Sequence, residues 1–425
     1  MLDDVYVVEV RPRRSPVAGA LSPKKWRGLK IGGAVVVGLG VIAAGVLAVG
    51  PGIVEKQRNP VAEVALKEPS PQALELHDGL LIADMHSDAL LWKRSILDRG
   101  ERGHVDVPRL REGNVALQVF ASVTQSPRGQ NLDGNTDETD NITPLVAAQL
   151  QPPRTWGSLF ERSMYHAEKL DRAVEGSDGQ LQWVRTKGEL DALVAEREAG
   201  GDVIGALYAL EGLHNLEGDG SNLRRLYDAG ARMAGFTHFF DNEVAGSMHG
   251  VDRGGLTDLG REVFAEMQEL GMAVDLAHAS PAAMADMIEL ADAPLVYSHG
   301  GVRATCDVNR NLTDEQIRGI ADTGGVIGIG YWEDAVWPGH RAGRRRHRPC
   351  GGRRRHRRRG AGLRLRRVGG GAVGHLPAGR DHPRTDGPRV LRQGHREDHG
   401  RQHPPRPAGG AAGVGTKQGW RPRLK

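Results

Sequence analysis

Short apolar runs alternate with helical patterns between residues 80 and 330, and this alternation restricts the fold to an α/β architecture with a largely parallel sheet. Helix start signals follow several of the runs. Ser280 and Pro281 form an N-cap and a first-turn proline, a capping box begins at Thr313, and residues 257–270 have one apolar face. The expected strands are residues 80–83, 115–123, 203–210, 233–237, 272–276, 295–297 and 326–329.

These seven strands are one short of a closed (β/α)8 barrel, a fold of about 250 residues that this 425-residue chain can contain with appendages. The polar segment 124–156 is predicted to be a long irregular loop on the active face. We therefore predict α/β class with a TIM-type barrel over residues 75–336, whose last strand and helices are lost.

Residues 31–54 contain no charged side chain over 24 positions, enough to cross about 30 Å of hydrocarbon as a helix. Arg and Lys are concentrated before this segment, which predicts a single-pass membrane anchor with a cytoplasmic N-terminus, residues 1–30. Residues 55–74 are predicted to be a linker, and the barrel is expected outside the cytoplasm. A cleaved signal peptide is the alternative.

The net charge of +4 conceals two oppositely charged parts. Residues 338–425 carry 23 Arg and 2 Lys against 4 acidic residues, which leaves the rest of the chain at −17. The segment 337–425 contains no Ile, Phe or Tyr and cannot build a core. A non-catalytic alternative is that this tail binds a polyanion. However, Trp420 is its only aromatic residue after Trp337, and the predicted anchor places the tail outside the cytoplasm. No nucleic acid is therefore expected as a partner.

Histidines and carboxylates follow the apolar runs, and they are the only abundant metal ligands, since the chain has just two cysteines. His86 and Asp88 form an H-x-D pair after the first run, and Glu211 ends the third. His278 and His299 come just after two later runs. Because parallel strands of a barrel end at the same face, the sequence predicts one metal site from these five residues.

The ordered motifs resemble those of the membrane dipeptidases of the renal dipeptidase type. The similarity covers residues 80–330, and it implies a (β/α)8 barrel that holds two zinc ions per subunit and hydrolyses dipeptides. A homodimer is left open. The motifs are Leu-Arg-Glu-Gly at 110–113, Glu-Gly at 211–212, Gly-Leu-Thr at 255–257, Asp-Leu-Ala-His-Ala-Ser at 275–280, Ser-His at 298–299 and Arg-Asn at 310–311.

The resemblance also implies a role for each matching residue. His86 and Asp88 correspond to ligands of one zinc, Glu211 to the bridging carboxylate, and His278 and His299 to ligands of the second zinc. His238 corresponds to the histidine that stabilises the oxyanion, and Arg310 to the residue that binds the substrate carboxylate. A water shared by the two zinc ions would lose its proton and attack the peptide carbonyl. Another binuclear amidohydrolase, acting on N-acyl amino acids or lactones, would use the same ligands.

The family's proton-shuttling aspartate, in a motif like Gly-Ser-Asp-Phe-Asp-Gly, has no counterpart in this sequence. Asp381 and Asp386 follow no apolar strand, so we assign no catalytic acid or base. A one-base shift of codons that can encode residues 363–367 yields Ser-Asp-Phe-Asp-Gly, and the same shift over residues 400–406 permits a second family-like motif. We therefore hypothesise a frameshift near residues 335–344, which would leave the chain able to bind zinc and poorly able to catalyse.

Overall fold

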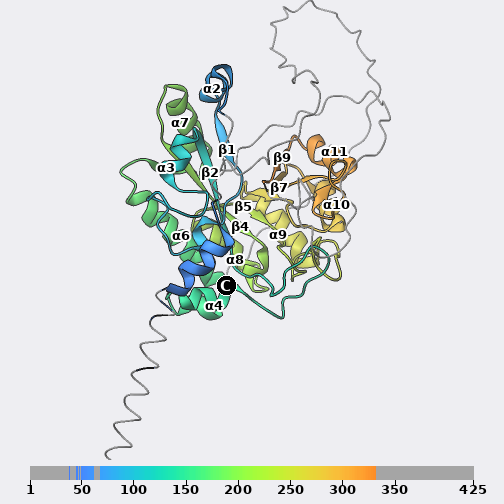
Figure 1. The fold of residues 1–425 in the computed structure, drawn as a ribbon. Coiled ribbons are helices and arrows are strands. Elements are labelled where there is room, and N and C mark those ends of the chain that lie inside the picture. The colour runs from blue at the N-terminus through green and yellow to red at the C-terminus, as the bar shows by residue number, and fades with distance from the viewer. Residues whose placement is uncertain (1–37, 39–44, 46, 48, 62–67, 332–425) are drawn as a thin grey trace, which may run out of the picture. The chain divides into compact units, whose positions relative to one another are not determined.

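The computed structural model describes residues 38, 45, 47, 49–61 and 68–331, and their central feature is a curled parallel sheet flanked by helices (Figure 1). Strands pair in the order β1-β2-β4-β5-β6-β7, with β9 also paired to β7, β3 to β4 and β8 to β7. The strands are β1 (Ile82–Asp84), β2 (Val115–Val123), β3 (Leu181–Trp183), β4 (Ile204–Glu211), β5 (Ala231–Gly235), β6 (Ala273–Asp275), β7 (Val296–Val302), β8 (Asn311–Leu312) and β9 (Val326–Ile329).

Helices connect these strands, and the predicted start signals are confirmed. The side chain of Ser280 accepts from the backbone of Ala283, and Thr313 forms a complete capping box with Gln316. The helices are α2 (Pro71–Asp78), α3 (Val107–Glu112), α4 (Ile142–Ala148), α5 (Arg154–Gly157), α6 (Leu159–Glu175), α7 (Lys187–Glu198), α8 (Ser221–Asp228), α9 (Asp258–Glu269), α10 (Pro281–Leu290) and α11 (Asp314–Asp322), with 3-10 turns η1 (Ala89–Leu91) and η2 (Leu213–Leu216).

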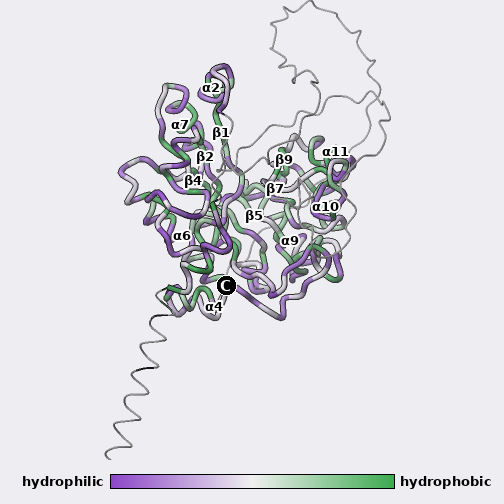
Figure 2. The backbone as a smooth tube through the Cα atoms, in the orientation of Figure 1, coloured by the Kyte–Doolittle hydropathy of each residue, from purple (hydrophilic) through white to green (hydrophobic). Residues whose placement is uncertain are grey.

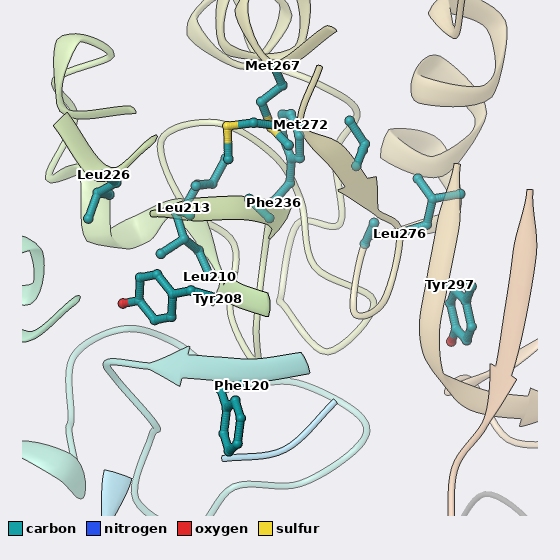
Figure 3. Close-up of a cluster of buried hydrophobic side chains, with 14 of the residues drawn as sticks. Phe120, Tyr208, Leu210, Leu213, Leu226, Phe236, Met267, Met272, Leu276 and Tyr297 are labelled. Atoms are coloured by element: carbon teal, nitrogen blue, oxygen red, sulfur yellow. The ribbon is translucent and has the colours of Figure 1, made fainter. Parts of the chain in front are cut away.

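The core lies between the strands and the helices that cover them. Apolar residues concentrate along the strands in Figure 2, whereas the connecting segments are more polar. Phe120, Tyr208 and Phe236 are fully buried in one continuous cluster (Figure 3). Burying each side chain of this size contributes about 1.5–3 kcal/mol. The cluster joins residues of the strands to residues of the surrounding helices.

The strand ends are level across the sheet, which brings distant parts of the sequence to one edge. Glu211 at the end of β4 pairs in register with Gly235 at the end of β5, and Gly235 pairs with Asp275 at the end of β6. Because all these strands are parallel, the segments that follow them emerge on the same side. The predicted site residues are therefore brought together by strand register.

The segment 124–156, expected to be irregular throughout, contains the two short helices α4 and α5. Arg162, almost completely buried, explains this difference. Its guanidinium donates to the carbonyl oxygens of Thr155 at 2.7 Å and Thr124 at 2.6 Å, and it pairs with Asp140 at 3.0 Å. Such long-range contacts order a polar segment whose local pattern predicts no helix.

The expected linker 55–74 is also partly helical. Residues 49–58 form a helix, and Glu55, only 3% exposed, pairs with Arg94 at 2.9 Å and Arg102 at 2.8 Å. At the other end Pro71 occupies the first turn of α2 behind the N-cap Ser70. Pro71 therefore starts a helix where a linker was predicted.

The predicted anchor falls mainly on residues that the structure does not describe. No helix among the described residues is both long enough and apolar enough to span a bilayer. The anchor at 31–54 stays a prediction.

Seven strands form the continuous parallel path, as predicted, and the short strands β3 and β8 were not predicted. The sheet curls far enough that a Cβ atom added to Gly328 of β9 would lie 3.5 Å from Sδ of Met85, which follows β1. Between residues 68 and 331 no strand joins β1 to β9. The hypothesised frameshift and the residues beyond it lie outside the described part of the chain.

Candidate functional site

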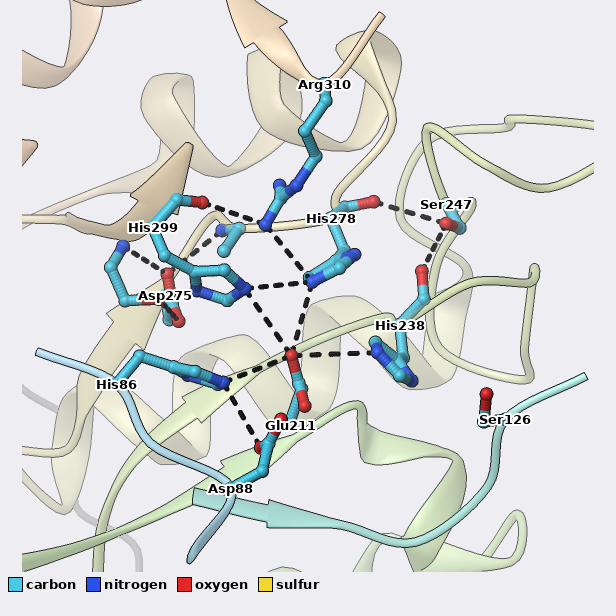
Figure 4. Close-up of polar contacts among 12 residues, drawn as sticks. His86, Asp88, Ser126, Glu211, His238, Ser247, Asp275, His278, His299 and Arg310 are labelled. Atoms are coloured by element: carbon cyan, nitrogen blue, oxygen red, sulfur yellow. Dashed lines mark hydrogen bonds and ion pairs between the residues drawn. The ribbon is translucent and has the colours of Figure 1, made fainter. Parts of the chain in front are cut away.

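Glu211 is the centre of a cluster of imidazoles at the carboxyl ends of the strands (Figure 4). Its side chain is almost completely buried. One carboxylate oxygen, Oε1, faces the Nε2 atoms of four histidines, at 3.4 Å from His86, 3.7 Å from His238, 3.2 Å from His278 and 3.5 Å from His299. All four histidines predicted from the sequence thus meet at one atom.

The ligand atoms form two groups that share Glu211. One group contains His86, Glu211 and His299, and the other contains Glu211, His238 and His278. The prediction instead joined His278 and His299 around the second metal and gave His238 a substrate role. His278 and His299 are also close, with 3.1 Å between their Nε2 atoms, so both assignments remain geometrically compatible.

Asp88 lies at the edge of the first group, 3.3 Å from Nε2 of His86, with its side chain 43% exposed. Within the described residues, Oε2 of Glu211 is buried without a hydrogen-bond partner, whereas Oδ1 of Asp88 faces Nε2 of His86. Buried carboxylate oxygens that lack a donor are costly unless a cation satisfies them. Imidazole nitrogens together with carboxylate oxygens are donors that suit zinc, so the residues present fit a metal.

Gly212 shapes the turn that follows Glu211. Its φ of +91° is unfavourable for residues with a side chain, and an added Cβ would lie 2.5 Å from the ring of His214 and 3.2 Å from Cβ of His238. His278 also has a left-handed backbone, with φ of +68°, and its carbonyl accepts from the backbone N–H of Met248 at 2.8 Å. Gly212 adopts its positive φ without strain, whereas the left-handed backbone of His278 is a strained position within the cluster.

We expect Gly212→Ala to lower the free energy of unfolding by about 1–3 kcal/mol, because the new methyl group meets two histidine side chains in a strained backbone region. Denaturant unfolding measures this change. Gly188→Ala in the first turn of α7 is the matched control, since a Cβ there meets only Oγ1 of Thr186 at 4.0 Å. Equal stability of the two variants would contradict the role given to Gly212.

Arg310 reaches the cluster from the segment between β7 and β8, and it is 2% exposed. Its guanidinium donates to the carbonyl of His299 at 2.8 Å, to Oη of Tyr297 at 3.0 Å and to Nε2 of His278 at 3.1 Å. The arginine predicted to bind the substrate carboxylate therefore borders the candidate metal ligands. A fixed cation at this place suits an anionic group next to the cluster.

The pKa of His86 is shifted upward, whereas the pKa values of its neighbours His278 and His299 are shifted downward. Burial lowers the pKa of an imidazole, but the charges of Glu211 and Asp88 outweigh burial at His86 and raise its pKa to about 10. Burial, together with Arg310 near His278 and His86 near His299, holds the pKa values of the last two well below 6.5. At neutral pH, His278 and His299 are thus neutral and have the lone pairs that a metal requires.

Zinc uptake at pH 8 is expected to release close to one proton from His86, because this pH lies below the pKa of about 10 in the metal-free protein and a ligand must be neutral. Calorimetric titration in buffers of different ionisation enthalpy counts the protons. With His86→Asn the release should fall by close to one proton, and any proton lost by metal-bound water should remain. Proton release that His86→Asn leaves unchanged would show that another group is the source.

Asp275 and Ser298 are site residues to which the sequence assigned no role. Oδ1 of Asp275 accepts from the backbone of Ala277 and of Ser298, both at 2.9 Å, and Ser298 Oγ lies 2.7 Å from Nδ1 of His299. A similar contact joins Nδ1 of His238 to the carbonyl of Gln125 at 3.1 Å. The available signals were the position of Asp275 at a strand end and the presence of both residues in the family-like motifs at 275–280 and 298–299, whereas carbonyl partners leave no mark in a sequence.

Comparisons with known proteins identify a family that this chain resembles. The model of a family described as membrane dipeptidase, peptidase family M19, matches residues 71–346. An uncharacterised dipeptidase of Schizosaccharomyces pombe is 27% identical over 238 residues, 56% of this chain and 54% of that protein. The dipeptidase aclJ of Aspergillus oryzae is 28% identical over 267 residues, 60% of this chain and 58% of that protein.

The chain thus spans just over half the length of the curated relatives it matches. Among solved structures, the probable dipeptidase PvdM from Pseudomonas aeruginosa superposes with a TM-score of 0.49 at 23% identity, covering 61% of this chain and 62% of that one.

Proposed function

This chain belongs to the membrane dipeptidase family, peptidase family M19, and we propose that it is a dipeptidase that uses two zinc ions to hydrolyse the peptide bond of dipeptides. The observation that carries the proposal is the position of Glu211, whose Oε1 is shared by two groups of candidate ligands. A carboxylate between two sets of imidazoles is suited to bridge two cations.

The residues around the ligands have complementary roles in this proposal. Arg310 would bind the free carboxylate of the dipeptide through its planar guanidinium, which favours dipeptides over longer peptides. His238 would donate to the oxyanion when it is not a ligand. When bound, zinc supplies Lewis-acid activation of water and of the scissile carbonyl.

A metal and substrate assay tests the proposal. The metal-free chain is loaded with zinc, its zinc content is measured, and it is then assayed with dipeptides, C-terminally amidated dipeptides, N-acyl amino acids and lactones. We expect two zinc ions per chain and a preference for dipeptides with a free carboxylate. Faster hydrolysis of lactones or N-acyl amino acids would favour the alternative amidohydrolase, and absence of zinc would overturn the metal assignment.

The missing proton-shuttling aspartate requires a second experiment, which compares two forms of the chain. A chain whose residues beyond 335 are restored by the one-base shift serves as the comparison for the chain as written. We expect the restored chain to hydrolyse dipeptides faster, with similar affinity for zinc, because the five predicted ligands all precede the shift. Equal activity of the two chains would refute the need for the lost aspartate.

We also propose that residues 31–54 anchor the enzyme in a membrane, with the catalytic domain outside the cytoplasm. The support is the 24-residue uncharged segment and the Arg and Lys residues that precede it. Membrane fractionation and protease accessibility in intact cells test this. Recovery of the full-length chain in the soluble fraction would contradict it.

A further inference from the structure

The side of His299 that faces away from the cluster is held by two buried polar residues. Oγ of Ser298 lies 2.7 Å from Nδ1 of His299 and also contacts Oδ2 of Asp275. Ser298 is 4% exposed and Asp275 is 5% exposed. The remaining oxygen of Asp275, Oδ1, accepts two backbone N–H groups at 2.9 Å. Asp275 thus receives three donors, an arrangement that suits a carboxylate, which can only accept.

The single proton of the Ser298 hydroxyl determines how this chain of hydrogen bonds is directed. When the hydroxyl donates to the carboxylate of Asp275, its oxygen must accept from Nδ1–H of His299. A neutral imidazole with its proton on Nδ1 has its lone pair on Nε2. That atom lies 3.5 Å from Oε1 of Glu211, inside the first group of candidate ligands.

The other histidines of the cluster show that this arrangement belongs to His299. His238 reaches the carbonyl of Gln125 directly through Nδ1, without a side chain between them. Nδ1 of His278 has no hydrogen-bond partner among the described residues. Nε2 of His278 lies 3.1 Å from Nε2 of His299 and would respond to it, so His166, whose Nδ1 lies 2.8 Å from Oγ of Ser122 outside the cluster, serves as the internal reference.

We propose that Ser298 and Asp275 are positioning residues that hold His299 in its Nδ1–H tautomer and so prepare its Nε2 lone pair for a cation. The identity of the cation as zinc rests on the proposed function. The tautomer itself does not, because it exists in the metal-free protein. Groups that orient a metal-binding histidine commonly change the affinity for the metal by about 10–100-fold.

Histidine tautomers can be read by long-range proton–nitrogen NMR on the full-length, metal-free chain labelled with 15N-histidine. The signal of His299 among the 17 histidines is assigned from its loss in His299→Gln. We expect the Nδ1–H form in the unmodified chain. Ser298→Ala should produce a mixture of tautomers at His299 and leave His166 unchanged, whereas Ser298→Thr, which keeps the hydroxyl, should preserve the original form.

Asp275→Asn provides a second variant with the opposite expectation. The Asn carbonyl oxygen still accepts the two backbone N–H groups, but its amide now donates to Oγ of Ser298. The hydroxyl would then donate to Nδ1 of His299 and select the Nε2–H tautomer, which directs a proton toward the candidate metal position. An Asp→Asn change that reverses a histidine tautomer in this way is known to disable other enzyme sites.

Zinc titration of the same variants completes the test. We expect the affinity to fall about 10–100-fold in Ser298→Ala, at least as far in Asp275→Asn, and to recover in Ser298→Thr. An Nε2–H form in the unmodified chain, or a tautomer unaffected by Ser298→Ala, would overturn the proposal. A changed tautomer with unchanged zinc affinity would overturn the role in preparing the site. If the tautomers are as expected but the chain binds no zinc, the hydrogen-bond assignment is supported and the proposed function is refuted.

Discussion

Glu211→Gln is expected to remove metal binding and dipeptide hydrolysis together. Burial by itself would raise the pKa of Glu211, but the charges of His238, His86 and Arg310 outweigh burial and lower it, so this side chain is a carboxylate at neutral pH. The variant keeps the volume of the side chain and loses the negative charge next to four imidazoles. An amide is a much poorer zinc ligand than a carboxylate.

The expected size of this effect exceeds that of any other single substitution in the site. Because Oε1 belongs to both groups of candidate ligands, zinc affinity should fall more than about 100-fold, the upper range for changes outside the ligand set. In the restored chain, hydrolysis should fall about 10³-fold or more, since the ligands act as a unit. Equilibrium dialysis with zinc and a dipeptide assay measure the two quantities.

Glu175→Gln is the matched control for this substitution. Glu175 is exposed at the end of α6, so the same chemical change should leave zinc content and activity unaffected. Unfolding curves of both variants separate a lost ligand from a lost fold. Full zinc content in Glu211→Gln would disprove the bridging assignment.

In the restored chain, Arg310→Lys is expected to reduce kcat/KM for dipeptides by about 10²–10³-fold, mainly through KM. Lys keeps the positive charge but replaces the planar fork of donors with a single ammonium group, which cannot bind a carboxylate through two parallel hydrogen bonds. Losing one partner of a buried, hydrogen-bonded charge pair typically costs 2–5 kcal/mol, which corresponds to about this change.

A substrate without a free carboxylate tests directly whether Arg310 binds that group. A C-terminally amidated dipeptide should be a poor substrate of the unmodified chain and should lose little further in Arg310→Lys. Arg318→Lys, an exposed position on α11, is the control and should behave as the unmodified chain. Equal losses for both substrates would show that Arg310 acts through its contacts with Tyr297, His278 and the carbonyl of His299.

Much of the fold could be predicted because parallel strands buried on both faces leave continuous apolar runs. Residues 115–123 and 326–329 were predicted with the bounds that the structure has, since long or well-delimited runs of this kind are easy to recognise. In contrast, β7 extends to Val302, so that His299 lies within the strand, where the prediction ended it at residue 297. A glycine pair after a histidine resembles a turn, and only pairing with β9 and β8 shows that the strand continues.

The sequence alone determined which residues form the candidate site, because ligands placed at the ends of parallel strands must meet once the strands align. The strand register aligns Glu211, Gly235 and Asp275 at the same height of the sheet, and the residues just after them emerge at the same edge. Only the tertiary structure decided which histidines form a group around Glu211, and that Asp275 and Ser298 hold His299. These relations depend on side-chain directions and hydrogen-bond partners within about 3–4 Å, which are set by packing between segments far apart in the chain.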